Sequence, residues 1–131
     1  MKIRPQEKKL IVVNANDKFG GYPILHVQKG EKYNFTVNPL NRWKYGYFSS
    51  STLGIWFSFW KRNLKRNRRA RYMELCGTIG KSIGDSDFRI GTNLNEYVVP
   101  TNGPLYFFPN IGLEEHERCS GNVVVKVQRI Q

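Results

Sequence analysis

Tyr33-Asn34-Phe35-Thr36-Val37 is the stretch from which the fold can be inferred. Its apolar residues alternate with polar ones, and this period of two places the apolar side chains on one face. Such alternation is typical of a half-buried β-strand. Gly30-Glu31 precedes the stretch and Asn38-Pro39 follows it, and both pairs favour turns. The sequence therefore predicts a strand over residues 33–37 with a turn at each end.

The same alternation of short apolar runs and turn residues continues in both directions along the chain. The runs are rich in β-branched and aromatic residues, and Gly, Pro and Asn separate them. They cover residues 11–13, 25–27, 53–60, 72–79, 88–91, 97–99, 105–108 and 122–127, with Gly20-Gly21 and Asn102-Gly103-Pro104 among the turns. Short strands at this spacing predict an all-β fold, an antiparallel β-sandwich.

Length and composition predict one folded domain over residues 1–131. The chain has a mass of 15.3 kDa, and aromatic residues make up 14 % of it, which favours a packed core over disorder. It contains no run of about 18 apolar residues, so no membrane span is predicted. Residues 10–13 are too few for a signal-peptide core, so we expect a cytoplasmic protein unless a targeting segment has been removed. Two free thiols, Cys76 and Cys119, are then favoured over one disulfide.

The most unusual feature of the composition is a basic segment, residues 61–72. It carries seven Lys and Arg residues in twelve positions and no carboxylate. The net charge of the chain is +11, and without these seven it would be +4. Because the segment lies between the predicted strands 53–60 and 72–79, we expect it to be the tip of a hairpin. Such a concentration of positive charge attracts polyanions, although a solvated loop is the alternative.

The second half of the chain carries motifs in a particular order. Leu75-Cys76-Gly77-Thr78-Ile79-Gly80-Lys81-Ser82 is followed by Phe88-Arg89-Ile90-Gly91, then by Leu105-Tyr106-Phe107-Phe108-Pro109-Asn110, and finally by Cys119-Ser120-Gly121-Asn122 before the last apolar run. This order resembles that of the calcium-dependent galactophilic bacterial lectins of the Pseudomonas type. The likeness covers about residues 24 to 127. It implies a jelly-roll, galactose-binding-like sandwich, in which Arg42-Trp43-Lys44-Tyr45-Gly46 would bring Tyr45 to the ligand site.

The resemblance does not extend to the calcium ligands. At the matching positions this chain has Ile111, Arg118 and Cys119. Calcium requires several hard oxygen ligands, usually including carboxylates, and an arginine repels the ion. Only Tyr45, which would contribute its backbone oxygen, matches. We therefore expect no metal and no cofactor at this position.

The candidate ligand-binding residues lie in and around the basic segment. Guanidinium groups bind phosphate or sulfate through two parallel hydrogen bonds, and aromatic faces stack on bases or sugar rings. The candidates are Arg62, Lys65, Arg66, Arg68, Arg69 and Arg71 for charged groups, and Trp56, Trp60 and Tyr45 for stacking. For the tryptophans, burial against a second sheet or a partner subunit is an equal alternative.

Two acidic clusters and the absence of enzyme motifs complete the inference of function. Asp85-Ser86-Asp87 and residues 114–117 are either solvated turns, a metal or acid–base site, or a surface that meets the basic segment of a neighbouring subunit. No nucleophile elbow, phosphate-binding loop or His-Glu-x-x-His motif occurs in the sequence, so no catalytic residue is assigned. The sequence thus predicts a non-enzymatic, lectin-like module that binds a carbohydrate or an anionic glycan polymer. The alternatives are a nucleic-acid-binding domain that uses residues 61–72, and a structural or assembly subunit that forms homo-oligomers.

Overall fold

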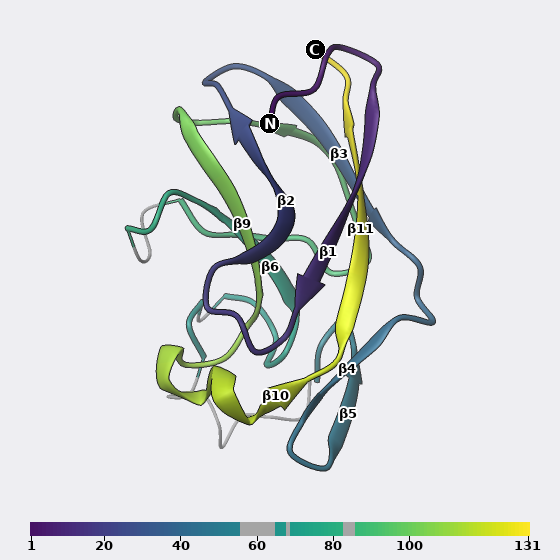
Figure 1. Cartoon of the computed structure of the whole chain (residues 1–131), viewed down its shortest axis with the longest axis vertical. Helices are drawn as coiled ribbons and strands as arrows, with labels where there is room; N and C mark the ends of the chain where they lie inside the picture. Colours follow the sequence, from purple (N-terminus) through teal and green to yellow (C-terminus); the bar gives the residue numbers. More distant parts are fainter. Residues whose placement is uncertain (56–64, 68, 83–85) are drawn as a thin grey trace.

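A computed structural model describes residues 1–55, 65–67, 69–82 and 86–131 of the chain (Figure 1). Strands dominate the described residues. They are β1 (Lys8–Asn14), β2 (Gly20–Val27), β3 (Lys32–Val37), β4 (Arg42–Tyr45), β5 (Phe48–Ser51), β6 (Leu75–Ile79), β7 (Phe88–Arg89), β8 (Asn93–Val98), β9 (Gly103–Pro109), β10 (Cys119–Ser120) and β11 (Asn122–Arg129), with a 3-10 helix η2 (Leu113–Arg118) before β10. The predicted all-β, antiparallel fold class is confirmed.

Eight of the strands form one strongly curved sheet in the order β7-β6-β9-β2-β1-β11-β3-β8. Its middle is the β1–β11 ladder, which runs from Lys8↔Gln128 to Asn14↔Asn122. Side chains on one face of these two strands, such as Val13 and Val125, have no exposed surface, while their neighbours along the strand face solvent. This period of two is why the short apolar runs of the sequence form strands.

Aromatic contacts bring the two edges of this sheet together. The rings of Phe88 in β7 and Tyr97 in β8 stack with their centroids 4.0 Å apart, and both contact the buried ring of Phe35. Gly77 in β6 makes room for this arrangement, because a Cβ atom there would lie 2.4 Å from the Phe88 ring. The sheet is therefore nearly closed, like a barrel.

A second, three-stranded sheet in the order β10-β4-β5 lies at the end of the molecule opposite the two chain termini (Figure 1). Trp43 of β4 joins it to the body. Its ring is fully buried, and its Nε1–H donates a hydrogen bond to the carbonyl of Met73 at 3.0 Å. Helix η2 follows β9 and leads into β10. This end of the molecule is therefore formed by the small sheet, η2 and the end of β9.

The strands predicted at 33–37, 88–91, 105–108 and 122–127 match β3, β7, β9 and β11 within two residues. Those predicted at 11–13, 25–27, 72–79 and 97–99 overlap β1, β2, β6 and β8 but differ by three or more residues at one end, and β4 and β5 were not predicted.

Two glycine sites also behave differently from expectation. Gly20-Gly21 was expected to form a turn and instead begins β2. A Cβ atom at Gly21 would lie 3.0 Å from the Phe107 ring, so these glycines serve close packing inside a strand. The strand expected over residues 53–60 does not begin at residue 53, because Gly54 has a φ of 84° and the chain turns before Ile55; residues 56–60 of that strand lie outside the described part of the chain.

Within the described residues, no helix is long and apolar enough to cross a membrane. Cys76 and Cys119 are both buried, and neither is bridged.

Candidate functional site

The small sheet and η2 bring one predicted site residue, Tyr45, into a polar cluster. The Tyr45 hydroxyl donates a hydrogen bond to Glu115 Oε2 at 2.8 Å, and Arg118 Nε lies 3.7 Å from the same oxygen. The ring of Tyr72 meets the ring of Tyr45 edge-on, with centroids 6.0 Å apart. We call Tyr45, Tyr72, Glu115 and Arg118 the Tyr45 cluster.

Backbone pairing fixes the positions of these side chains. Cys119 pairs with Tyr45 between β10 and β4, so the last residue of η2 is brought next to the β4–β5 turn. The amide of Gly46 donates to the carbonyl of Arg118 at 2.9 Å, and the amide of Glu115 donates to Gly112 at 2.9 Å. Two segments that lie about 70 residues apart in sequence are thereby held in one register.

The electrostatics of the cluster keep its hydroxyls protonated and its arginine charged. The hydrogen bond to Glu115 raises the pKa of Tyr45, and burial adds to this effect. Burial, followed by the nearby Tyr45, raises the pKa of Tyr72. The hydrogen bond with Tyr45 and the charge of Glu115 raise the pKa of Arg118, whose side chain is 67 % exposed.

This arrangement can recognise a hydroxyl-rich ligand. The carboxylate accepts hydrogen bonds from hydroxyl groups, the guanidinium donates them, and a phenol ring offers an apolar face. Sequence reasoning had placed Tyr45 near a ligand. It had treated Glu115 only as a member of the acidic cluster 114–117, with a solvated turn, a metal or acid–base site and a contact with a neighbouring subunit as its alternatives. It had treated Arg118 only as a lost metal ligand. The spacing of Glu115 and Arg118 on one turn was the signal that could have paired them.

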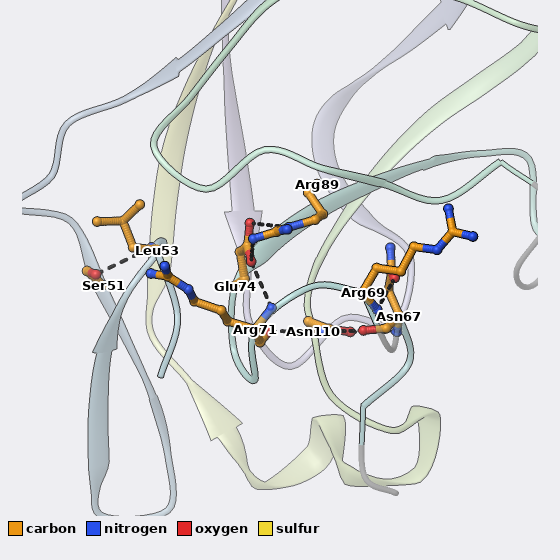
Figure 2. A network of polar contacts seen from close by, with 8 residues as sticks. All are labelled: Ser51, Leu53, Asn67, Arg69, Arg71, Glu74, Arg89 and Asn110. Carbon is orange, nitrogen blue, oxygen red and sulfur yellow. Dashed lines mark hydrogen bonds and ion pairs between the residues drawn. The ribbon is translucent and has the colours of Figure 1, made fainter. Parts of the chain in front are cut away.

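The described part of the basic segment is attached to the end of β9 by Asn110. The Asn110 side chain is fully buried and makes three hydrogen bonds (Figure 2). Its Oδ1 accepts from the amide of Asn67 at 2.7 Å, and its Nδ2 donates to the carbonyls of Asn67 at 2.8 Å and Arg71 at 2.9 Å. Ile55 and Tyr72 also form an isolated antiparallel bridge. Residues 65–72 are therefore part of the packed body where the structure describes them.

Arg66, one of the predicted contacts, is turned toward this body. Its guanidinium lies over the rings of Phe108 at 3.8 Å and Phe19 at 4.7 Å, and its Nη1 donates to the carbonyl of Lys18. Burial lowers its pKa. Cation–π stacking explains how an arginine tolerates this partly buried place. In this conformation Arg66 anchors the segment.

The other predicted contacts fall into two groups. Arg69 and Arg71 are exposed, but Figure 2 shows their side chains directed away from one another on either side of Asn110. Lys65 is half-buried. The structure thus does not bring Arg66, Arg69 and Arg71 together around one ligand position. Arg62, Arg68, Trp56 and Trp60 lie outside the described residues, and their roles stay predictions.

A part-buried ion pair that sequence reasoning missed supports the same region. Glu74, whose side chain is 6 % exposed, accepts two hydrogen bonds from Arg89, at 3.1 and 3.2 Å. Its Oε1 also accepts from the amide of Arg71 at 2.8 Å (Figure 2). The pair links β6, β7 and the basic segment. The sequence could not have predicted this ion pair, because Glu74 and Arg89 are 15 positions apart and no local pattern links them.

The residues that match the lectin calcium ligands do not fit the ion. Ile111 is fully buried in the hydrophobic core. Burial raises the pKa of Cys119 to about 11, so its thiol stays protonated, and Arg118 carries a positive charge. Among the described residues, no group of three or more His, Cys, Asp or Glu side chains could hold a metal ion.

Comparisons with known proteins support the fold. No family model and no curated protein sequence matches the chain. Among solved structures, the chain is similar to one described as "EclA N-terminal domain; PllA-like lectin". The similarity covers 93 % of this chain and 94 % of that one, with a TM-score of 0.62 and 15 % sequence identity. At this identity the match shows that the chain has a lectin-like fold.

Proposed function

We propose that this protein is a non-enzymatic module that binds carbohydrate through the Tyr45 cluster. The observation that carries the proposal is the convergence of Glu115 and Arg118 on Tyr45 at one end of a lectin-like fold. The chemistry of the cluster supports it, because sugar recognition needs paired acceptors and donors beside an aromatic ring.

Charge supports an anionic glycan as the ligand. The chain carries a net charge of +11, and Arg69 and Arg71 are exposed beyond the cluster. A positive field of this size raises the local concentration of a polyanion. Nucleic acid would be attracted by the same field, and self-association through unlike charges is a third outcome. The test below therefore also measures binding of nucleic acid and self-association.

The test is a glycan array with the intact chain, accompanied by single-stranded oligonucleotides measured by fluorescence anisotropy. We expect binding to a defined set of glycans, and we expect Glu115→Gln to weaken it roughly tenfold because one carboxylate acceptor is lost. The matched control is Glu114→Gln, an exposed residue of the same turn, which should bind like the unaltered protein.

Three results would contradict the proposal. One is equal loss of binding in both glutamate variants. Another is binding to oligonucleotides but to no glycan, which would favour the nucleic-acid alternative. The third is a concentration-dependent oligomer in light scattering that dissociates when Arg69 and Arg71 are neutralised, together with no glycan binding, which would favour an assembly role.

A further inference from the structure

Arg118 lies at a position that the resemblance to the lectins matches to a calcium ligand, and its charge gives it the opposite chemical preference. It sits at the end of η2, with its backbone carbonyl fixed by the amide of Gly46. Its side chain is 67 % exposed, and its only ion pair among the described residues is the long 3.7 Å contact with Glu115. Most of the guanidinium is therefore open to solvent and to a ligand.

We infer that the Tyr45 cluster binds a carboxylated sugar without a metal ion, with Arg118 pairing with the carboxylate. This inference rests on the proposed carbohydrate-binding function and names the class of sugar. A guanidinium and a carboxylate form two parallel, charge-assisted hydrogen bonds, which are stronger than bonds to a neutral hydroxyl. In this site the fixed positive charge replaces the charge that a bound cation would supply.

Glu115 restricts which sugars the site can bind. Tyr45 donates to its Oε2, and no described hydrogen bond uses its Oε1. That oxygen can accept a hydrogen bond from a hydroxyl group, but it repels a second anionic group. A uronate fits both partners, because it carries one carboxylate and several hydroxyls on one ring. A densely sulfated chain fits less well.

The β4–β5 turn provides a surface for the sugar ring itself. Tyr47 follows Gly46 in this turn, and its side chain is fully exposed. The bond from the Gly46 amide to the carbonyl of Arg118 places the turn beside the backbone of Arg118. Lys44 is also exposed on β4 and adds positive charge near the same edge. An exposed aromatic ring on one of the two paired segments and a guanidinium on the other suit a sugar that has an apolar ring face and a carboxylate.

The experiment compares uronate oligosaccharides with their methyl esters in calcium-free buffer that contains a chelator. Oligogalacturonate, oligoglucuronate and alginate fragments are titrated by calorimetry, each beside its neutral ester and beside a sulfated dextran. We expect at least one acid to bind roughly tenfold more tightly than its ester, with no loss on chelation. Arg118→Gln should remove this preference, and Arg118→Lys should restore part of it.

The control is Arg4→Gln, which removes the same charge at the other end of the β1–β11 ladder, before Lys8. It should leave the preference for the acid unchanged. Equal binding of acids and esters, abolition by the chelator, or equal loss in Arg118→Gln and Arg4→Gln would each overturn the inference. Tighter binding of sulfated dextran that is independent of Arg118 would do the same. If neutral glycans still bind and depend on Glu115, only this inference fails and the proposed function stands.

Discussion

Arg66 and Arg69 differ in role although they are three positions apart in one basic segment. The guanidinium of Arg66 stacks on Phe108 and Phe19, while Arg69 is exposed. Two aromatic rings compensate for the water that Arg66 loses. The number of cations in a segment therefore overstates the charge that a ligand can reach.

His116 is the residue whose protonation should control stability in mild acid. Its ring is buried, its Nδ1 lies 3.1 Å from the carbonyl of Ala15, and its Nε2 has no hydrogen-bond partner. Burial lowers its pKa below the ordinary value of about 6.5. Below that pH the unfolded chain binds a proton that the folded chain does not. The free energy of unfolding should therefore be fully retained above about pH 6.5 and fall as the pH drops toward the folded pKa.

Urea unfolding measured between pH 5 and pH 7.5 checks this expectation. His116→Gln should flatten the pH dependence, even if it also lowers stability at neutral pH. The control His26→Gln changes an exposed histidine and should keep the slope of the unaltered protein. A slope that survives in His116→Gln would assign the effect to other groups.

At the scale of elements, Asn110 connects the end of β9 to the basic segment. Asn110→Ala would leave the part-buried amide of Asn67 without its partner and would remove one of two hydrogen bonds from each of the carbonyls of Asn67 and Arg71. The three lost bonds should lower the free energy of unfolding by about 3 kcal/mol. The freed arginines should also become more accessible to trypsin. Both effects can be measured, by urea unfolding and by limited proteolysis of the native protein.

Asn102→Ala is the matched control for this prediction. Asn102 is exposed and accepts one described hydrogen bond, from the amide of Lys29. The Asn102→Ala substitution should lower the free energy of unfolding by about 1 kcal/mol or less. Similar stability losses in the two variants, with unchanged trypsin cleavage within residues 65–71, would show that Asn110 does not fasten the segment.

At the scale of the whole molecule, closure of the large sheet depends on the missing side chain of Gly77. A methyl group there would meet the Phe88 ring at 2.4 Å and displace it from its stack on Tyr97. Gly77→Ala should lower the free energy of unfolding by about 1–3 kcal/mol. Thermal unfolding measures the loss of stability. In the double variant Gly77→Ala/Phe88→Leu the side chain at position 88 is smaller, so the Gly77→Ala substitution should cost less stability there than it does when Phe88 is present. Additive losses in the double variant would mean that the two positions do not interact.

Strands with a strong local signal, such as β3 and β11, were predictable, whereas β4 and β5 were missed. Alternation at Tyr33–Val37, and the apolar run that forms β11, need only the period of the backbone to assign one face to the core. The motif order likewise led to the lectin-like fold. Gly20-Gly21 and Gly54 misled because a glycine forms a turn, or permits close packing, according to neighbours that are distant in sequence.

The sequence by itself determined the all-β fold class and the excess of positive charge, since each follows from residue type and spacing. The mismatch of Ile111 and Cys119 to calcium ligands is what its resemblance to the lectins implies. Only the tertiary structure decided that Arg66 turns inward, that Asn110 fastens residues 65–72, and that Tyr45, Glu115 and Arg118 meet. Tyr45, Glu115 and Arg118 meet because strand β4 pairs with strand β10. That pairing joins segments about 70 residues apart, and no local pattern encodes a contact between side chains so far apart in the chain.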